Sequence, residues 1–123
     1  MPGNHFKTAG AGENIAAREV EAVLTAMPEI LEAAVVPVRD EQRGEEVKAY
    51  LVPQEGSGPK AKLVERVIDH CIKNLAPFKV PRYLEVVAAL PKTSSGKIAK
   101  QTLIDQKVDL RSESYDRVSG QWR

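Results

Sequence analysis

The chain has 123 residues, 42% of them hydrophobic and 28% charged. This predicts one ordinary globular domain and is too short for a typical two-domain enzyme. A formal net charge of +1 gives no reason to expect a nucleic-acid or anionic-membrane partner. No apolar run approaches the roughly 18 residues that span a bilayer, the polar start lacks the order of a signal peptide, and a single cysteine excludes an internal disulfide, so we expect a cytoplasmic protein.

The chain opens with a stretch rich in glycine and small polar residues, which predicts a flexible lead-in over residues 1–11. The histidine in it, His5, has no Cys or His at metal-ligand spacing and indicates no metal site. A helix is expected over residues 16–27, because its valines, leucine and methionine recur at spacings of three and four and form one buried stripe. Pro28 cannot continue a helix and marks its end.

Two short segments rich in Ala and Val, 30–38 and 47–52, predict strands. The polar connection between them contains Gly44, which can take a positive φ, so the two strands are expected to form an antiparallel pair. The charges in this connection are dense, and we interpret them as a solvated loop in preference to an active site.

A glycine-rich loop then precedes a segment whose apolar residues fall on one arc of a helix over residues 60–75. Cys71 lies inside that arc, and we predict a small buried core residue rather than a nucleophile. His70 lies at the edge of the arc without a nearby metal-ligating partner, so it is interpreted as a boundary residue.

The C-terminal third is expected to contain one more strand and one short helix. Two prolines precede the strand, predicted over residues 83–87, and the helix begins at about Ile98. Residues 108–123 form a polar tail that is not expected to build a core by itself. The order of elements predicts a small α+β domain, with helices packed on an antiparallel or mixed sheet of about three main strands.

The most conspicuous feature of the sequence is the loop that leads to Lys97. Thr93, Ser94, Ser95 and Gly96 precede it, and such small residues let the backbone bend and lift one long cationic side chain clear of the domain. A Gly-Lys pair after small residues also suggests the phosphate-binding loop of nucleotide hydrolases. That motif needs a glycine five positions before Gly96 and a Ser or Thr after the lysine, where this chain has Pro and Ile, so this interpretation fails.

Little else in the sequence indicates chemistry. It offers no Ser/His/Asp or Cys/His set, no cluster at metal-ligand spacing and no glycine-rich dinucleotide fingerprint. A lone lysine can cancel charge on a carboxylate or phosphate, but it needs a partner surface that binds the substrate. The residues by themselves therefore predict one functional group, Lys97, and no metal site.

Three motifs stand in order along the chain: Gly-Glu-Asn-Ile at 12–15 followed by Arg-Glu-Val-Glu at 18–21, Phe-Lys-Val-Pro at 78–81, and Leu-Pro-Lys-Thr-Ser-Ser-Gly-Lys-Ile at 90–98. Together they resemble the small C-terminal domain of the AMP-forming adenylating superfamily, which includes acyl-CoA and aryl-CoA synthetases. The resemblance implies a domain over residues 12–107, between the lead-in and the polar tail.

In that family a carboxylic acid reacts with Mg-ATP to give an acyl-adenylate and pyrophosphate, and a thiol, usually of coenzyme A, then displaces AMP. The C-terminal domain rotates between the two steps. The resemblance assigns Lys97 to the adenylation lysine, which bridges the substrate carboxylate and the phosphate oxygens, with the four preceding residues positioning it. It also places Gly12 in the wall of the CoA thiol tunnel, with Glu13 and Asn14 beside it.

The resemblance also implies what this chain lacks. The large N-terminal domain, which carries the ATP loop and the acid pocket in that family, has no counterpart in the sequence. The domain alone is therefore expected to bind no cofactor and to be inactive, with ATP, Mg²⁺ and CoA acting in the complete enzyme.

Three interpretations remain open. In the first, the chain is the mobile C-terminal domain of a fatty or aryl acid–CoA ligase, partnered in cis or in trans by an N-terminal adenylation domain, with CoA or the acyl-adenylate at the interface. In the second, it is a free-standing module that binds CoA, a nucleotide or another protein without catalysis. In the third, it is a stable remnant without activity.

Overall fold

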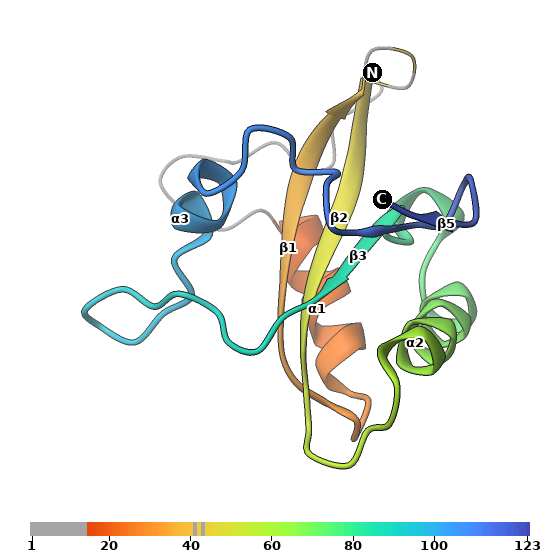
Figure 1. Cartoon of the computed structure of the whole chain (residues 1–123), viewed down its shortest axis with the longest axis horizontal. Coiled ribbons are helices and arrows are strands. Elements are labelled where there is room, and N and C mark those ends of the chain that lie inside the picture. Colours follow the sequence, from red (N-terminus) through yellow and green to blue (C-terminus); the bar gives the residue numbers. More distant parts are fainter. Residues whose placement is uncertain (1–14, 41, 43) are drawn as a thin grey trace.

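The computed structural model describes residues 15–40, 42 and 44–123, and there a five-stranded sheet carries helices on both faces (Figure 1). The expected α+β class is confirmed. No helix in these residues is both long and apolar enough to cross a membrane. In chain order the elements are α1 Ile15–Thr25, β1 Ile30–Asp40, β2 Gly44–Pro53, α2 Lys60–Asn74, the 3₁₀ turn η1 Pro77–Lys79, β3 Tyr83–Val86, α3 Lys100–Asp105, β4 Tyr115–Asp116 and β5 Gln121–Trp122.

The first two strands form the antiparallel pair that the sequence predicts. They pair from Ile30 opposite Pro53 to Asp40 opposite Gly44, and Gly44 begins β2 with a φ of +83°, which glycine adopts without strain. β3 pairs with β2 in parallel, because the chain returns through α2 before it enters the sheet again. Of the two alternatives in the fold prediction, the sheet is therefore mixed rather than antiparallel throughout.

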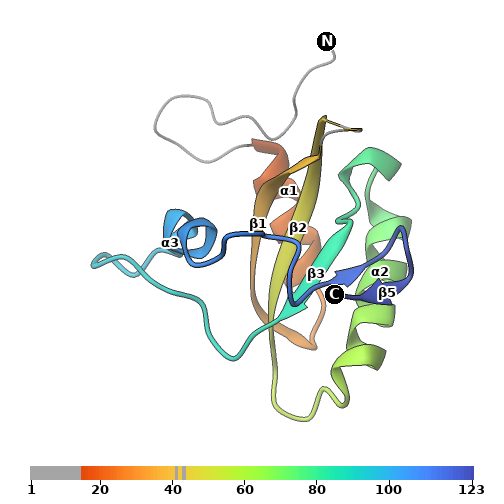
Figure 2. The same cartoon turned by 45° about the horizontal axis from the view of Figure 1, so that its top comes forward.

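Both faces of the sheet are covered. Successive residues of a strand point to opposite faces. On one face α1 and α2 cover the main core, with Val20 and Val67 fully buried. On the other face Leu103 of α3 and Leu90 pack over a smaller cluster. Figures 1 and 2 both show α3 on the side of the sheet away from α2. Two-sided burial explains why β1 and β2 read as nearly continuous apolar runs.

The predicted polar tail contributes two short strands to the sheet. β4 pairs with β3, and β5 pairs with β4, both antiparallel. Trp122, whose placement the sequence does not decide, is 40% exposed, and its ring packs against Tyr115 with 5.3 Å between ring centroids. The tail thus extends the sheet, although its polar sequence gave no indication of these strands.

Buried polar groups attach this tail to the sheet. The fully buried Lys48 of β2 donates hydrogen bonds from Nζ to the carbonyl oxygen of Leu110 at 2.6 Å and to Glu85 at 2.7 Å. Burial lowers the pKa of Lys48, and the contact with Glu85 only partly opposes that effect. Nearby, the guanidinium of Arg82 donates two hydrogen bonds to the buried carboxylate of Asp116, at 3.0 and 3.2 Å.

The prediction that Cys71 is a small buried core residue is confirmed. Its side chain lies within the main core and is fully buried. Burial raises the pKa of the thiol to about 11, and the positive charge of Arg117 offsets this only in part. A neutral thiol closed off from solvent is a poor nucleophile.

This placement predicts a slow thiol reaction. In the folded chain Cys71 is expected to react with dithiobis(nitrobenzoic acid) at least about 100-fold more slowly than in the unfolded chain, because burial and a raised pKa both suppress the thiolate. Absorbance-monitored rate constants at pH 7.5, with and without guanidinium, measure the ratio. Equal rates in the two states would contradict the buried placement.

Candidate functional site at the Lys97 hairpin

Residues 91–99 fold into a hairpin, called here the Lys97 hairpin. Lys92 and Ile98 face each other across it in an antiparallel bridge, and the Thr93 N–H donates to the carbonyl oxygen of Lys97 at 2.7 Å. The helix expected from about Ile98 begins two residues later, as α3, because Ile98 is held in this bridge. The loop is therefore an ordered turn with two paired arms.

The tip of the hairpin is a tight turn from Thr93 to Gly96, with Ser94 and Ser95 at its corner. The Gly96 N–H donates to the Thr93 carbonyl oxygen at 2.9 Å. The Lys97 N–H donates to the Thr93 hydroxyl at 3.2 Å, and that hydroxyl lies 3.1 Å from the one of Ser95. Gly96 has a φ of +87°, and a methyl group there would meet nothing within 4 Å. Backbone conformation, rather than space, therefore favours glycine at this position.

Lys97 projects from the domain. Residues 92–97 are all exposed, and Figures 1 and 2 both show the hairpin extending away from the sheet, beyond α3. Within the described part of the chain, no hydrogen bond or ion pair engages the Lys97 ammonium group. A cation is thus presented to any ligand or protein surface that meets this side of the domain.

The root of the hairpin is packed on the sheet. Leu90, before the first arm, and Leu103, in α3, are 5% and 3% exposed. With the partly buried Ile98 they cover the face of β1 and β2 opposite the main core. The two ends of the hairpin are therefore fixed by apolar burial, while its tip is free of such contacts.

Two ion pairs flank this root. On one arm Lys92 lies 2.9 Å from Glu32 of β1. Just beyond the other arm Lys100, the first residue of α3, lies 2.6 Å from Glu21 of α1. These partners are not predictable from the sequence, because they belong to different elements, where the i,i+4 spacing that reveals helical pairs does not apply.

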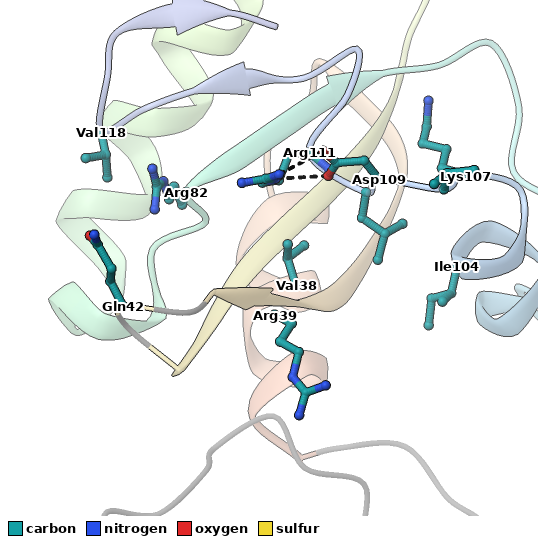
Figure 3. Close-up of a pocket in the computed structure, with 11 residues that line it drawn as sticks. Val38, Arg39, Gln42, Arg82, Ile104, Lys107, Asp109, Arg111 and Val118 are labelled. Carbon is teal, nitrogen blue, oxygen red and sulfur yellow. Dashed lines mark hydrogen bonds and ion pairs between the residues drawn. The ribbon is translucent and has the colours of Figure 1, made fainter.

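A groove of about 950 Å³ lies on the hairpin face of the sheet, between the end of β1 and the tail (Figure 3). The cationic side chains of Arg39, Arg82, Lys107 and Arg111 line it. Arg111 is already paired with Asp109 through two hydrogen bonds of 2.9 Å, and Arg82 is paired with the buried aspartate described above. Arg39 and Lys107 point away from one another (Figure 3). The charges do not converge, so the groove offers no defined anion site.

A second cavity, of about 570 Å³, lies beside the hairpin root. Tyr50 lines it and is 2% exposed, and its hydroxyl has no hydrogen-bond partner among the described residues. Burial, together with the charges of Glu85 and Glu113, raises the pKa of Tyr50 to about 12. The hydroxyl is therefore a neutral donor at physiological pH, next to the segment that enters the hairpin.

The residues predicted as site residues fall into two groups. The predicted CoA-binding residues Gly12, Glu13 and Asn14 lie outside the described residues, and their role stays a prediction. The residues predicted to carry and position the cation share the single turn of the hairpin; they are Thr93, Ser94, Ser95, Gly96 and Lys97.

Comparison with known proteins places this hairpin in a family. The profile of the AMP-binding enzyme C-terminal domain matches residues 19–97. The human mitochondrial acyl-coenzyme A synthetase ACSM4 is 43% identical over 100 residues, which cover 79% of this chain and 17% of that protein.

Solved structures agree in fold as well as in sequence. An acyl-CoA synthetase from Brucella canis superposes with a TM-score of 0.69 and is 38% identical, covering 79% of this chain and 19% of that one. An anthranilate CoA ligase in complex with anthranoyl-AMP superposes with a TM-score of 0.66 at 35% identity, covering 72% of this chain and 17% of that one. The chain thus spans less than a fifth of the length of the proteins it matches.

Proposed function

Because the chain belongs to the family of AMP-binding enzyme C-terminal domains, we propose that it is the mobile domain of an acid–CoA ligase and supplies Lys97 to the adenylation step. An N-terminal adenylation domain, in the same protein or in a partner, binds ATP and the carboxylic acid. The observation that carries the proposal is the exposed Lys97, held beside an ordered turn within the segment that the family profile covers.

The chemistry of adenylation explains the need for such a cation. A carboxylate must approach a phosphate while negative charge moves onto the leaving pyrophosphate, so a cation between the groups stabilises the transition state more than the ground state. One contact at about 4 Å is worth roughly 4 kcal/mol at an effective dielectric constant of about 20, before desolvation. One relative was solved with anthranoyl-AMP, which supports an acyl-adenylate as the species formed.

For the second step we propose that Gly12 lines the passage of the CoA thiol, with Glu13 and Asn14 beside it. The resemblance of residues 12–15 to the family motif supports this, together with the room that glycine leaves for the pantetheine arm. The thiol attacks the acyl carbonyl, the thioester bond forms, and AMP leaves with the electron pair of the broken bond. Lys97 is withdrawn when the thiol approaches.

The proposal distributes the small molecules between two domains. ATP, Mg²⁺ and a fatty or aryl acid belong to the partner domain, and CoA or the acyl-adenylate lies at the interface. Within the described residues no group of His, Cys, Asp and Glu side chains could hold a metal ion, so no step is assigned to a metal on this domain. A cytoplasmic location is part of the proposal and is supported by the unpaired Cys71.

Rescue of a truncated ligase tests the proposal. The Brucella canis acyl-CoA synthetase, shortened to end before the segment that this chain matches, is expected to regain acyl-CoA formation when this chain is added in trans or fused to it. The reason is that the missing cation and tunnel wall return together. Chromatography that detects released AMP and the thioester product measures the rescue. The rate of the untruncated synthetase is the upper limit for comparison.

Two controls make the outcome decisive. A chain carrying Lys62→Ala, at an exposed position of α2, should rescue as the unchanged chain does, whereas Lys97→Ala should not. Equal rescue by Lys97→Ala would contradict the role of the lysine. Failure of both fused and added chains, with CoA nevertheless shifting NMR signals of residues 12–14, would favour a free-standing CoA-binding module.

A further inference from the structure

The direction of the Lys97 hairpin is not set by the sheet. Within the described residues, its backbone hydrogen bonds join its own two arms and lead into α3. Among the strands that the structure describes, none pairs with it. Apolar packing of Leu90 and Leu103 holds the root, but such contacts are non-directional. A cation that must meet two anionic groups at once needs a defined direction as well as a fixed root.

Glu21 supplies one directional contact. Its Oε2 atom lies 2.6 Å from Nζ of Lys100 and accepts the backbone N–H of Val35 at 2.8 Å. β1 is an edge strand, so this N–H would otherwise lack a partner. One carboxylate oxygen therefore joins α1, the edge of β1 and the first residue of α3, where the second arm of the hairpin ends.

Glu32 supplies the other. Its carboxylate lies 2.9 Å from the Lys92 ammonium at the start of the first arm. The two pairs grip the hairpin before and after Lys97, and both glutamates belong to the body of the domain. The side chains of the Glu21 pair are 18% and 21% exposed, and those of the Glu32 pair 33% and 38%. The first pair is therefore screened less by solvent and should act more strongly.

We propose that Glu21 and Glu32 are positioning residues that aim the Lys97 hairpin through Lys100 and Lys92. This inference rests on the proposed function, because a defined orientation of the hairpin matters only if Lys97 acts in adenylation. Neither glutamate touches substrate. Each glutamate holds one end of the hairpin through its lysine. The hairpin then samples fewer orientations, and the Lys97 ammonium is kept in the position that adenylation needs.

The two half-reactions separate positioning from folding. In the fused enzyme of the rescue experiment, Glu21→Gln together with Glu32→Gln removes the charges and keeps an amide oxygen for the Val35 N–H. This double variant is expected to form the acyl-adenylate about fivefold more slowly, from the loss of two partly exposed pairs. Thioester formation from supplied acyl-adenylate does not use Lys97 and is expected to stay unchanged. A general loss of folding would slow both half-reactions.

A matched control uses another pair of the same kind. Glu29 lies 3.1 Å from Arg66, with side chains 30% and 42% exposed, and among the described residues no hydrogen bond or ion pair joins this pair to the hairpin. Glu29→Gln is expected to leave both half-reactions unchanged. In a fused enzyme that already carries Lys92→Met and Lys100→Met, the two glutamine substitutions should have no further effect on adenylation. The two glutamates have then already lost the lysines through which they orient the hairpin.

The outcomes distinguish this inference from the function on which it rests. If Lys97→Ala retains adenylation, the proposed function fails. If Lys97→Ala loses adenylation while Glu21→Gln/Glu32→Gln keeps the full rate, or loses both half-reactions alike, the positioning role fails alone.

A second measurement needs no activity. Backbone ¹⁵N relaxation of this chain should show larger-amplitude motion of residues 93–97 in Glu21→Gln/Glu32→Gln, with the sheet unchanged. Unchanged order parameters in the hairpin would overturn the positioning role.

Discussion

Replacing Asp116 by alanine is expected to lower the free energy of unfolding of this chain by about 3–5 kcal/mol, because it removes the buried carboxylate that accepts two hydrogen bonds from the largely buried Arg82 guanidinium. The Asp116 side chain is 1% exposed and that of Arg82 is 14% exposed. The carboxylate also accepts the backbone N–H groups of Val118 at 3.0 Å and Ser119 at 3.3 Å. These contacts hold the turn between β4 and β5. Urea unfolding followed by the fluorescence of Trp122 measures the loss.

Asp109 provides the matched control. Its carboxylate accepts two hydrogen bonds from Arg111 at 2.9 Å, as Asp116 does from Arg82, but the two side chains are 46% and 43% exposed. These hydrogen bonds lower the pKa of Asp109 to about 2. Solvent screening nevertheless limits the expected cost of Asp109→Ala to about 0–1 kcal/mol. Similar losses from both substitutions would contradict the argument from burial.

The same carboxylate predicts a dependence on pH. Burial alone would raise the pKa of Asp116, but the hydrogen bonds from Arg82 and from the two backbone N–H groups outweigh it and hold the pKa below the ordinary value. A depressed pKa in the folded state contributes stability above about pH 4, and that contribution disappears as the pH falls through the folded-state pKa. The stability of the unchanged chain should therefore fall below about pH 4 more steeply than that of Asp116→Asn.

The main core was predictable because its signals are local. Apolar spacings of three and four in 16–27 and 60–75 indicated the helices, and Ala- and Val-rich segments around Gly44 indicated the antiparallel pair. Such patterns record which face of an element is buried. They do not record how strands separated by a helix pair, so the parallel pairing of β3 was left open.

The tail escaped prediction for a different reason. β4 and β5 are two residues long each, too short for a pattern to build up. Their attachment depends on Lys48 and Asp116, buried charges whose partners lie far away in sequence. A buried charge is stable only with such partners. The residues next to Lys48 and Asp116 in the sequence do not indicate which residues these partners are.

The candidate site was likewise predictable only in the part that depends on local sequence. Its turn was predictable, because small residues followed by glycine specify a tight bend locally. Its support was not: an acidic residue on a helix, such as Glu21, usually faces solvent, whereas the Glu21 carboxylate joins three elements. The sequence around a glutamate on a helix surface does not indicate which distant lysine it will contact in the folded domain.

Lys97→Ala in the fused ligase is expected to lower the rate of acyl-adenylate formation by about 100- to 1,000-fold, the range found when one preorganised donor to a developing charge is removed. The lysine lies beyond the apolar root of the hairpin and is exposed, so its removal should not affect folding. Pyrophosphate exchange with ATP and the carboxylic acid measures this half-reaction directly.

The second half-reaction separates a role of Lys97 in adenylation from a role at the domain interface. With acyl-adenylate supplied, Lys97→Ala is expected to form thioester within about twofold of the unchanged enzyme, because the lysine stabilises a charge that develops only in the first step. Lys97→Arg keeps the charge but replaces a compact ammonium by a planar fork, and should fall between alanine and lysine in adenylation. Equal loss in both steps would mean that Lys97 supports the domain interface, and that the cation required for adenylation comes from elsewhere.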